Sequence, residues 1–248
     1  MFEGIESIIL AFLIFIAALL YSSVGHAGAS GYIAAMALLG VAPATMKPVA
    51  LSLNVLVASI ATIKFYRADA FSWNLFWPLA IASIPFAYLG GLLVLPSQIY
   101  KPLVGAVLIY AAWRSYHTAN NPPNSSLRVV GLPIIMLAGA CLGLLSGLTG
   151  VGGGIFLSPI LLFFRWAEPK KISGIAAGFI LVNSIAGLFG CFTSAVTIPR
   201  SLPLWAVAAV IGGYIGADFG SKRLGNPTIQ KLLALVLFIA GVKMVTTG

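Results

Sequence analysis

The chain has 248 residues, of which 60% are hydrophobic and 8% charged, and its mean hydropathy is +1.05. Soluble domains are about half apolar and about a quarter charged, and disordered chains are poor in apolar residues, so the composition excludes a soluble enzyme and a disordered chain. The net charge of +9 does not indicate a nucleic-acid partner, because the basic residues are scattered at the ends of apolar runs. The composition predicts an all-α polytopic protein of the cell (inner or plasma) membrane, surrounded by the lipid bilayer.

Ten apolar segments follow one another along the chain. Eight are long enough to cross a hydrocarbon core of roughly 30 Å; they cover 5–23, 47–66, 73–95, 98–116, 128–148, 172–196, 202–223 and 227–246. The first is expected to be a retained helix, because Glu3 precedes it and no small-residue cleavage site follows. Two shorter segments, 31–41 and 154–164, each follow a glycine-rich break. As helices they would cover about half the bilayer, so we predict half-helices there.

The order long, short, long, long, long occurs twice and predicts an internal repeat. At positions 125 apart, Gly25 corresponds to Gly150 and Gly28 to Gly153. The longest polar stretch, around Pro122 and Pro123, then joins the halves. We predict a first transmembrane repeat over 1–116, a polar linker over 117–127 and a second transmembrane repeat over 128–248.

Basic residues predict how the halves are oriented. If all ten segments cross, five in each half, most basic residues collect on one side, and the positive-inside rule favours this arrangement. An odd number of crossings per half makes the repeats inverted and places both termini outside the cytoplasm. The cytoplasmic set is then Lys64, Arg67, Arg114, Arg128, Arg165, Lys170, Lys171, Lys222, Arg223 and Lys231, against Lys47, Lys101, Arg200 and Lys243.

Inverted repeats with broken helices are typical of secondary transporters, whose site lies near the midplane between the repeats. The free N–H groups where each half-helix begins, near Ser30 and Gly154, form the positive end of a helix dipole and favour an anion. We therefore predict a small anionic substrate at the two breaks. Its candidate contacts are Gly25, His26, Ala27, Gly28 and Ser30 in the first break and Gly150, Gly152, Gly153 and Gly154 in the second.

The run from Gly25 to Tyr32, and Gly150-Val151-Gly152-Gly153-Gly154 followed by Pro159, resemble the paired glycine motifs of the sulfite exporter TauE/SafE family. The stretch 65–73 also resembles that family's short basic turn between membrane helices. The similarity extends over nearly the whole chain. It implies a carrier for sulfite, an organosulfonate or a related sulfur- or carbon-containing oxyanion. His26, Ala27 and Ala29 depart from an all-glycine cluster, which leaves the particular anion open.

Polar residues inside the apolar segments add further candidates. His26 is the only histidine in an apolar setting; an ordinary pKa near 6.5 would let it relay protons or pair with an anion, and a structurally satisfied histidine is the alternative. Asn54, Asn183 and Ser184 lie in the third segment of each half. They either line the substrate site or form interhelical hydrogen bonds. Proton coupling and a homodimeric assembly are open at this stage.

The remaining motifs predict packing rather than chemistry. Small residues four apart indicate helix contacts; they are Gly139, Gly143 and Gly147, and Gly212, Gly216 and Gly220. Asp218 is expected to pair with Lys222, and the cysteines predict no disulfide. No Walker lysine motif, zinc-ligand spacing or nucleophile elbow is present, so we predict no cofactor, no metal and no enzymatic activity. A membrane enzyme or assembly factor and an anion channel are the alternatives to a carrier.

Overall fold

In the computed structural model, the chain is described over residues 4–120, 127–128, 130–193 and 198–222, and at 235, 238–239, 241–242 and 245–246. These residues contain no strand. Their helices are α1 (Ile5–Ser22), α2 (Ala29–Leu38), α3 (Pro43–Arg67), α4 (Trp73–Leu92), α5 (Ser97–Asn120), α6 (Leu132–Thr149), α7 (Gly154–Phe163), α8 (Pro169–Phe192) and α9 (Leu202–Lys222).

The helices follow the predicted apolar segments, with the two short ones where half-helices were expected. Six helices, α1, α3, α4, α6, α8 and α9, are long and apolar enough to cross a membrane. The predicted segment 227–246 lies largely outside the described residues. Helix α5 extends to Asn120, so the first four residues of the predicted linker, 117–120, are helical, and 121–126 lie outside the described residues.

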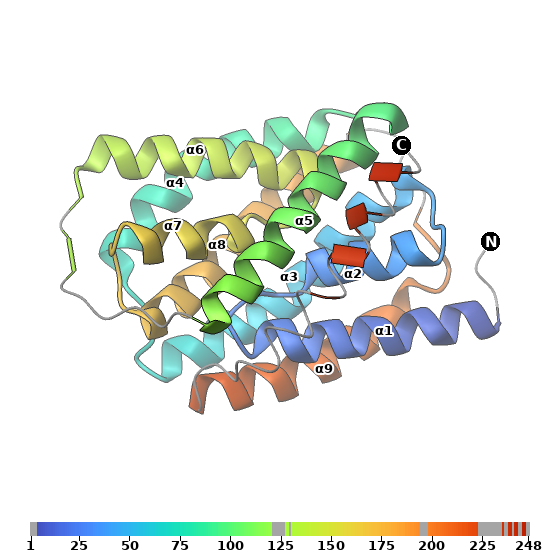
Figure 1. Cartoon of the computed structure of the whole chain (residues 1–248), viewed down its shortest axis with the longest axis horizontal. Coiled ribbons are helices and arrows are strands. Elements are labelled where there is room, and N and C mark those ends of the chain that lie inside the picture. The colour runs from blue at the N-terminus through green and yellow to red at the C-terminus, as the bar shows by residue number, and fades with distance from the viewer. Residues whose placement is uncertain are drawn as a thin grey trace.

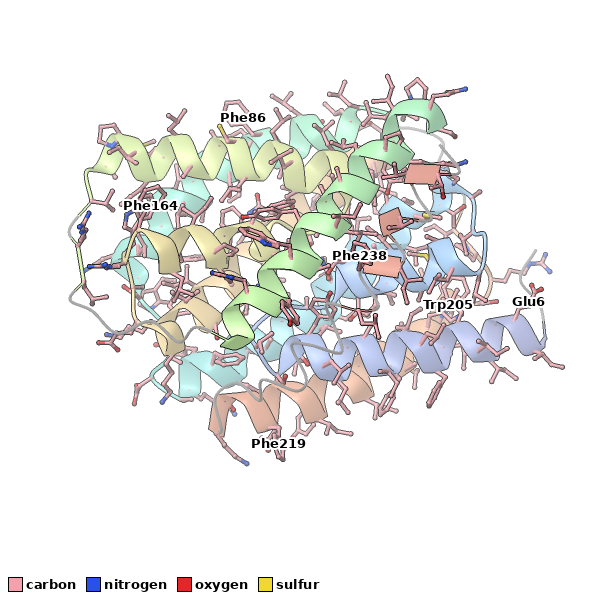
Figure 2. The ribbon with its side chains drawn as sticks, in the orientation of Figure 1. Glu6, Phe86, Phe164, Trp205, Phe219 and Phe238 are labelled. Carbon is pink, nitrogen blue, oxygen red and sulfur yellow. The ribbon has the colours of Figure 1, made fainter. Side chains whose placement is uncertain are left out.

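Large apolar side chains project outward from the bundle. Phe86 of α4 and Phe219 of α9 are 40% and 59% exposed, and Figure 2 shows both at the periphery. Trp205 of α9, by contrast, is fully buried, and its Nε1 donates to Ser7 O and Ser7 Oγ, both at 3.2 Å. An apolar periphery around helices of membrane-spanning length is suited to lipid, so the chain is an all-α, multi-pass membrane protein.

Two helix pairs form the flanks of the bundle. Helix α1 packs along α9 and helix α6 along α4, while α3 and α8 contact each other between these pairs (Figure 1). Both pairs are close because glycines face backbone: Gly139, Gly143 and Gly147 lie against Leu79, Ser83 and Ala87, and Gly212, Gly216 and Gly220 lie against Phe15, Leu19 and Ser23. The predicted packing role of these glycines is confirmed.

The same contacts give the helix directions. Residue numbers rise together along α1 and α9 and along α4 and α6, so each pair is parallel. Helix α9 is also parallel to α3, and α8 to α4, whereas α3 and α8 are antiparallel. These directions follow from the contacts Val57–Gly213, Lys64–Asp218, Phe76–Gly178, Gly91–Gly187, Leu51–Gly187 and Phe65–Gly174. Helices α1, α3 and α9 therefore run one way, and α4, α6 and α8 run the other.

Candidate functional site

The first break joins α1 to α2 through two glycines with left-handed backbone. Gly25 has φ +81° and Gly28, the residue before α2, has φ +112°. A side chain at Gly25 would collide with the backbone of Ser173 in α8, so this glycine permits close contact between distant parts of the chain. Tyr32 of α2 donates from its hydroxyl to Ala27 O at 2.5 Å, which holds the break against the half-helix.

The second break joins α6 to α7 in a similar way. Gly150, Gly152 and Gly153 all have positive φ, between +78° and +84°. A Cβ at Gly152 would lie 2.6 Å from Asn54 Nδ2, and one at Gly153 would lie 2.9 Å from Phe179 Cε1. Glycine is needed here both for the backbone conformation and because side chains from α3 and α8 press on the turn.

The two half-helices start and end with equivalent hydrogen bonds at positions 125 apart. The start of α2 is Tyr32 N to Gly28 O at 2.9 Å, and that of α7 is Leu157 N to Gly153 O at 3.1 Å. Their ends are closed by Val41 N to Met36 O and by Trp166 N to Leu161 O, both at 2.9 Å. The correspondence read from Gly25 and Gly28 thus extends through both short helices.

Neither half-helix has a side chain capping its first turn. The N–H groups of Ala29 and Ser30, and of Gly154 and Ile155, donate to no acceptor within the described part of the chain. All four residues are buried. Helix starts normally find partners in side chains, water or ligands, so these two buried starts are positions where a ligand could supply an acceptor.

His26 connects the two breaks. Its Nε2 lies 3.1 Å from Gly154 O and 3.0 Å from Ser158 Oγ, at the first and second turns of α7. The ring also packs edge-on against Tyr21, with ring centroids 6.4 Å apart. The first break therefore contacts the beginning of the second half-helix directly, as expected if both breaks contribute to one site.

Asn54 brings α3 to the second break and to α8. Its Nδ2 donates to Val151 O at 3.4 Å and to Ser184 Oγ at 3.3 Å. Asn183 instead donates to Phe179 O of its own helix at 2.8 Å. All three polar residues are fully buried. Of the predicted residues, His26, Gly152, Gly154, Asn54 and Ser184 thus meet around the second break, while the amide N–H of Asn183 is used within α8.

Lys47 lies beside this region, although the sequence places it only among topology-setting charges. It is 8% exposed, and its Nζ donates to Gly90 O, Gly91 O and Leu93 O at 2.9, 3.1 and 3.1 Å. These carbonyls end α4, where a helix dipole favours a cation. Its stem packs on the second break, since a Cβ at Gly150 would lie 3.1 Å from Lys47 Cγ. The sequence does not reveal this burial, because Pro48 follows Lys47 directly and makes the position resemble the start of a helix. In the structure both residues lie inside α3.

Ser158 and Ser146 are two further polar residues at the breaks that sequence reasoning did not single out. Ser158 contacts His26, and the Cβ of Ser146 lies 3.3 Å from where a Cβ at Gly153 would be. Serine is common in membrane helices as a packing residue, so nothing in the sequence distinguishes these two.

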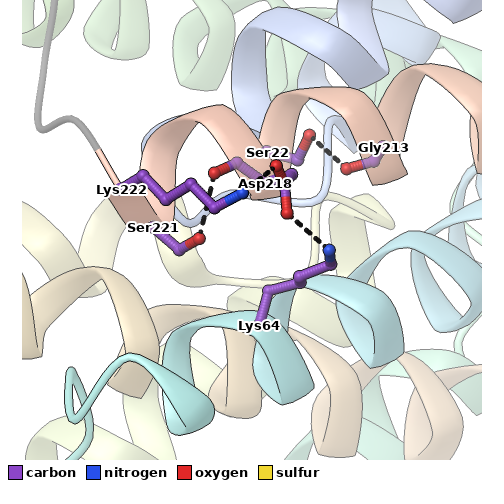
Figure 3. Close-up of polar contacts among 6 residues, drawn as sticks. All are labelled: Ser22, Lys64, Gly213, Asp218, Ser221 and Lys222. Carbon is purple, nitrogen blue, oxygen red and sulfur yellow. Dashed lines mark hydrogen bonds and ion pairs between the residues drawn. The ribbon is translucent and has the colours of Figure 1, made fainter.

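Asp218 lies apart from the breaks, at the end of α9. Its carboxylate contacts Lys222 Nζ at 2.7 Å, as the sequence predicts, and also Lys64 Nζ of α3 at 2.6 Å (Figure 3). The Lys64 ammonium also sits 4.1 Å from the centroid of the Tyr214 ring. The acid is thus held by two lysines and links α3 to α9.

Broken helices that meet inside an apolar bundle are found in many secondary transporters. Comparison with known proteins gives the same class and a family. The chain belongs to the sulfite exporter TauE/SafE family, whose model matches residues 10–244. The resemblance seen in the glycine motifs is thereby confirmed.

Curated relatives agree with this assignment. The chain is 39% identical over 245 residues to a probable membrane transporter protein of Sinorhizobium fredii, covering 96% of this chain and 98% of that protein. It is 28% identical over 202 residues to another of Methanocaldococcus jannaschii, covering 75% and 73% of the two chains. No solved structure matches the chain. The relatives are named as transporters, which confirms the expectation of a multi-pass membrane transporter rather than an enzyme.

Proposed function

We propose that the protein is a secondary transporter for a small oxyanion, such as sulfite or an organosulfonate, bound between two inverted repeats. The observation that carries the proposal is the pair of buried, uncapped starts of α2 and α7. Four N–H groups there have no acceptor among the described residues, and an oxyanion would supply one at the positive ends of both helices. The family name, sulfite exporter, supports the substrate class.

Helix directions support the inverted repeat. Helix α1 runs opposite to its counterpart α6, α3 opposite to α8, and α4 opposite to α9. Each flanking pair also combines one helix from each half. Helix α1 of the first half packs on α9 of the second, and its counterpart α6 of the second half packs on α4 of the first. Such an arrangement is expected when two related halves interlock about a two-fold axis in the membrane plane.

The charge distribution supports a cytoplasmic location for one end of the bundle. Lys64 and Arg67 end α3 and Lys222 ends α9, while Lys170 and Lys171 begin the antiparallel α8. All five therefore lie at the same end. The turn after Arg67 also carries a cluster of rings with centroids 4.8–6.1 Å apart, as is typical of a membrane–water interface; its members are Tyr66, Phe71, Trp73, Phe76 and Trp77.

Most residues of the candidate site are buried in this structure, and His26 is partly buried. Asn54, Asn183 and Ser184 are fully buried, and the glycines of both breaks are buried with them. Transport therefore needs the halves to move apart on one side at a time. The contacts that must change include the hydrogen bonds of His26 with α7 and of Asn54 with Val151 and Ser184.

The test is saturable sulfite and sulfonate flux into liposomes containing purified protein, with a matched pair of glycine variants. Gly153 and Gly40 have φ of +78° and +77°, but a Cβ at Gly40 would meet nothing within 4 Å. Both Gly153→Ala and Gly40→Ala carry the left-handed strain of about 1–2 kcal/mol. We expect Gly153→Ala alone to lose anion binding, because its methyl presses on Phe179 beside the start of α7. Equal effects of the two variants on binding, or no saturable flux of any anion in the wild type, would contradict the proposal.

A further inference from the structure

Three buried side-chain oxygens near the second break have no hydrogen-bond partner. They are Asn54 Oδ1, Asn183 Oδ1 and Ser146 Oγ, and all three residues are fully buried. Within the described part of the chain, none of these oxygens accepts a hydrogen bond. Buried polar atoms in proteins are nearly always paired, because leaving one without a partner is costly. Unpaired oxygens at this place indicate a ligand that brings hydrogen-bond donors.

Asn54 and Ser146 both lie against the glycine turn. A Cβ at Gly152 would lie 2.6 Å from Asn54 Nδ2, and a Cβ at Gly153 would lie 3.3 Å from Ser146 Cβ. Asn183 belongs to the same neighbourhood through Phe179, whose carbonyl accepts its amide and whose ring presses on Gly153. Residues of α3 and α6 that carry an unpaired oxygen therefore contact the turn that begins α7, and a third such residue, in α8, bonds to Phe179, whose ring contacts the turn.

Both asparagines present their amide oxygens as acceptors. Asn54 Nδ2 faces Val151 O, and Asn183 Nδ2 faces Phe179 O. Exchanging the amide oxygen and nitrogen of either asparagine would place its Oδ1 against a backbone carbonyl oxygen, and both atoms are acceptors. The start of α7, in contrast, presents the donors of Gly154 and Ile155. The second break thus offers N–H donors and amide acceptors side by side.

We propose that the second break binds the substrate as a monoanion that also carries a hydroxyl group. Its charged oxygens accept from the N–H groups that begin α7, and its hydroxyl donates to Asn54 Oδ1, with Ser146 and Asn183 completing the acceptor side. A bare metal cation would be repelled by the positive end of α7, and amides do not take up protons near neutral pH. The inference rests on the proposed function, since it specifies the form of the transported anion.

The test compares two probes that differ by one hydroxyl, methanesulfonate and hydroxymethanesulfonate, in binding to the purified full-length protein. We expect hydroxymethanesulfonate to bind about tenfold more tightly, the value of one hydrogen bond between a substrate donor and a buried acceptor. The Asn54→Leu variant should lose this preference. Ser52→Ala, on the same helix, should keep it, because Ser52 Oγ bonds only to Pro48 O among the described residues.

The wild-type comparison decides the inference even where Asn54→Leu does not fold. Equal binding of the two sulfonates by the wild type would overturn the inference. This is the result expected if an ordered water, rather than the substrate, donates to Asn54 Oδ1. The proposed function would not be affected by it. A second measurement needs no variant: affinity for total sulfite should fall as rising pH removes the hydrogen sulfite form, while that for methanesulfonate stays constant. Constant sulfite affinity would also overturn the inference. Saturable binding of none of these anions would contradict the proposed function instead.

Discussion

At the scale of single residues, His26 joins the two breaks. Its Nε2 contacts Gly154 O and Ser158 Oγ, so one imidazole joins the end of α1 to the beginning of α7. Opening the site to either side would break these contacts and hydrate the ring. Because a histidine ordinarily changes its charge between about pH 5 and 8, we propose that His26 exchanges a proton with water when the site opens.

We therefore expect His26→Gln to fold and transport, but with a flux of methanesulfonate, whose charge is constant, that no longer changes between about pH 5 and 8. Glutamine keeps a side-chain N–H for Gly154 O and does not titrate. The measurement is initial flux in liposomes against pH, with a second histidine variant, His117→Gln at the end of α5, as the control. A wild-type pH profile in folded His26→Gln would limit His26 to its hydrogen bonds.

Sequence and structure agree best at the glycine breaks. The spacing of Gly25, Gly28, Gly150 and Gly153 predicts both breaks, because few other residues tolerate positive φ. The partners of the breaks could not be predicted in the same way. Ser158 and Lys47 reach the site only through the packing of α7 and α3, and a single sequence does not record which face of an apolar helix is turned inward.

At the scale of helices, α7 ends in a left-handed backbone conformation that the sequence does not predict. The equivalent end of α2 has Gly40 at φ +77°, while α7 ends with Arg165 at φ +60°. Left-handed backbone costs a non-glycine residue about 1–2 kcal/mol. Two hydrogen bonds enforce it here, Arg165 N to Leu162 O at 3.2 Å and Trp166 N to Leu161 O at 2.9 Å. An arginine at position 165 therefore gives no indication that α7 ends in the same turn as α2.

The Lys64–Asp218–Lys222 cluster joins α3 to α9 at the basic end of the bundle (Figure 3). These side chains are 22%, 35% and 71% exposed, and exposed ion pairs contribute little to stability. We expect Asp218→Asn to retain transport within about twofold, because water at this end replaces the lost pairs. Flux and binding in liposomes test this. Loss of flux with intact anion binding in a folded variant would instead make Asp218 part of the coupling mechanism.

At the scale of the whole molecule, the positions of the apolar helices in the described part of the chain were the most predictable feature. Apolar runs of membrane-spanning length have one stable solution in lipid, the helix, so α1 to α9 follow the sequence closely. The pairing of α4 with α6 and of α1 with α9 was not predictable. It depends on Gly143 meeting Ser83 and Gly216 meeting Leu19, contacts that the small-residue spacing allows without naming the partner.

The proposed inverted arrangement predicts which loops share a side of the membrane. Arg67 and Lys170 lie at one end of the bundle, while Ala42 and Arg200 precede α3 and α9 at the other end, and all four are exposed. Single cysteines at these positions, in a background with Cys141 and Cys191 replaced by alanine, should react with an impermeant thiol reagent from opposite sides. We expect Arg67→Cys and Lys170→Cys to label only in inside-out vesicles, and Ala42→Cys and Arg200→Cys only in right-side-out vesicles or cells. Retained flux in each variant controls for folding. Labelling of positions 67 and 200 from the same side would require parallel halves, and the two half-helix starts would then no longer approach one substrate from opposite directions.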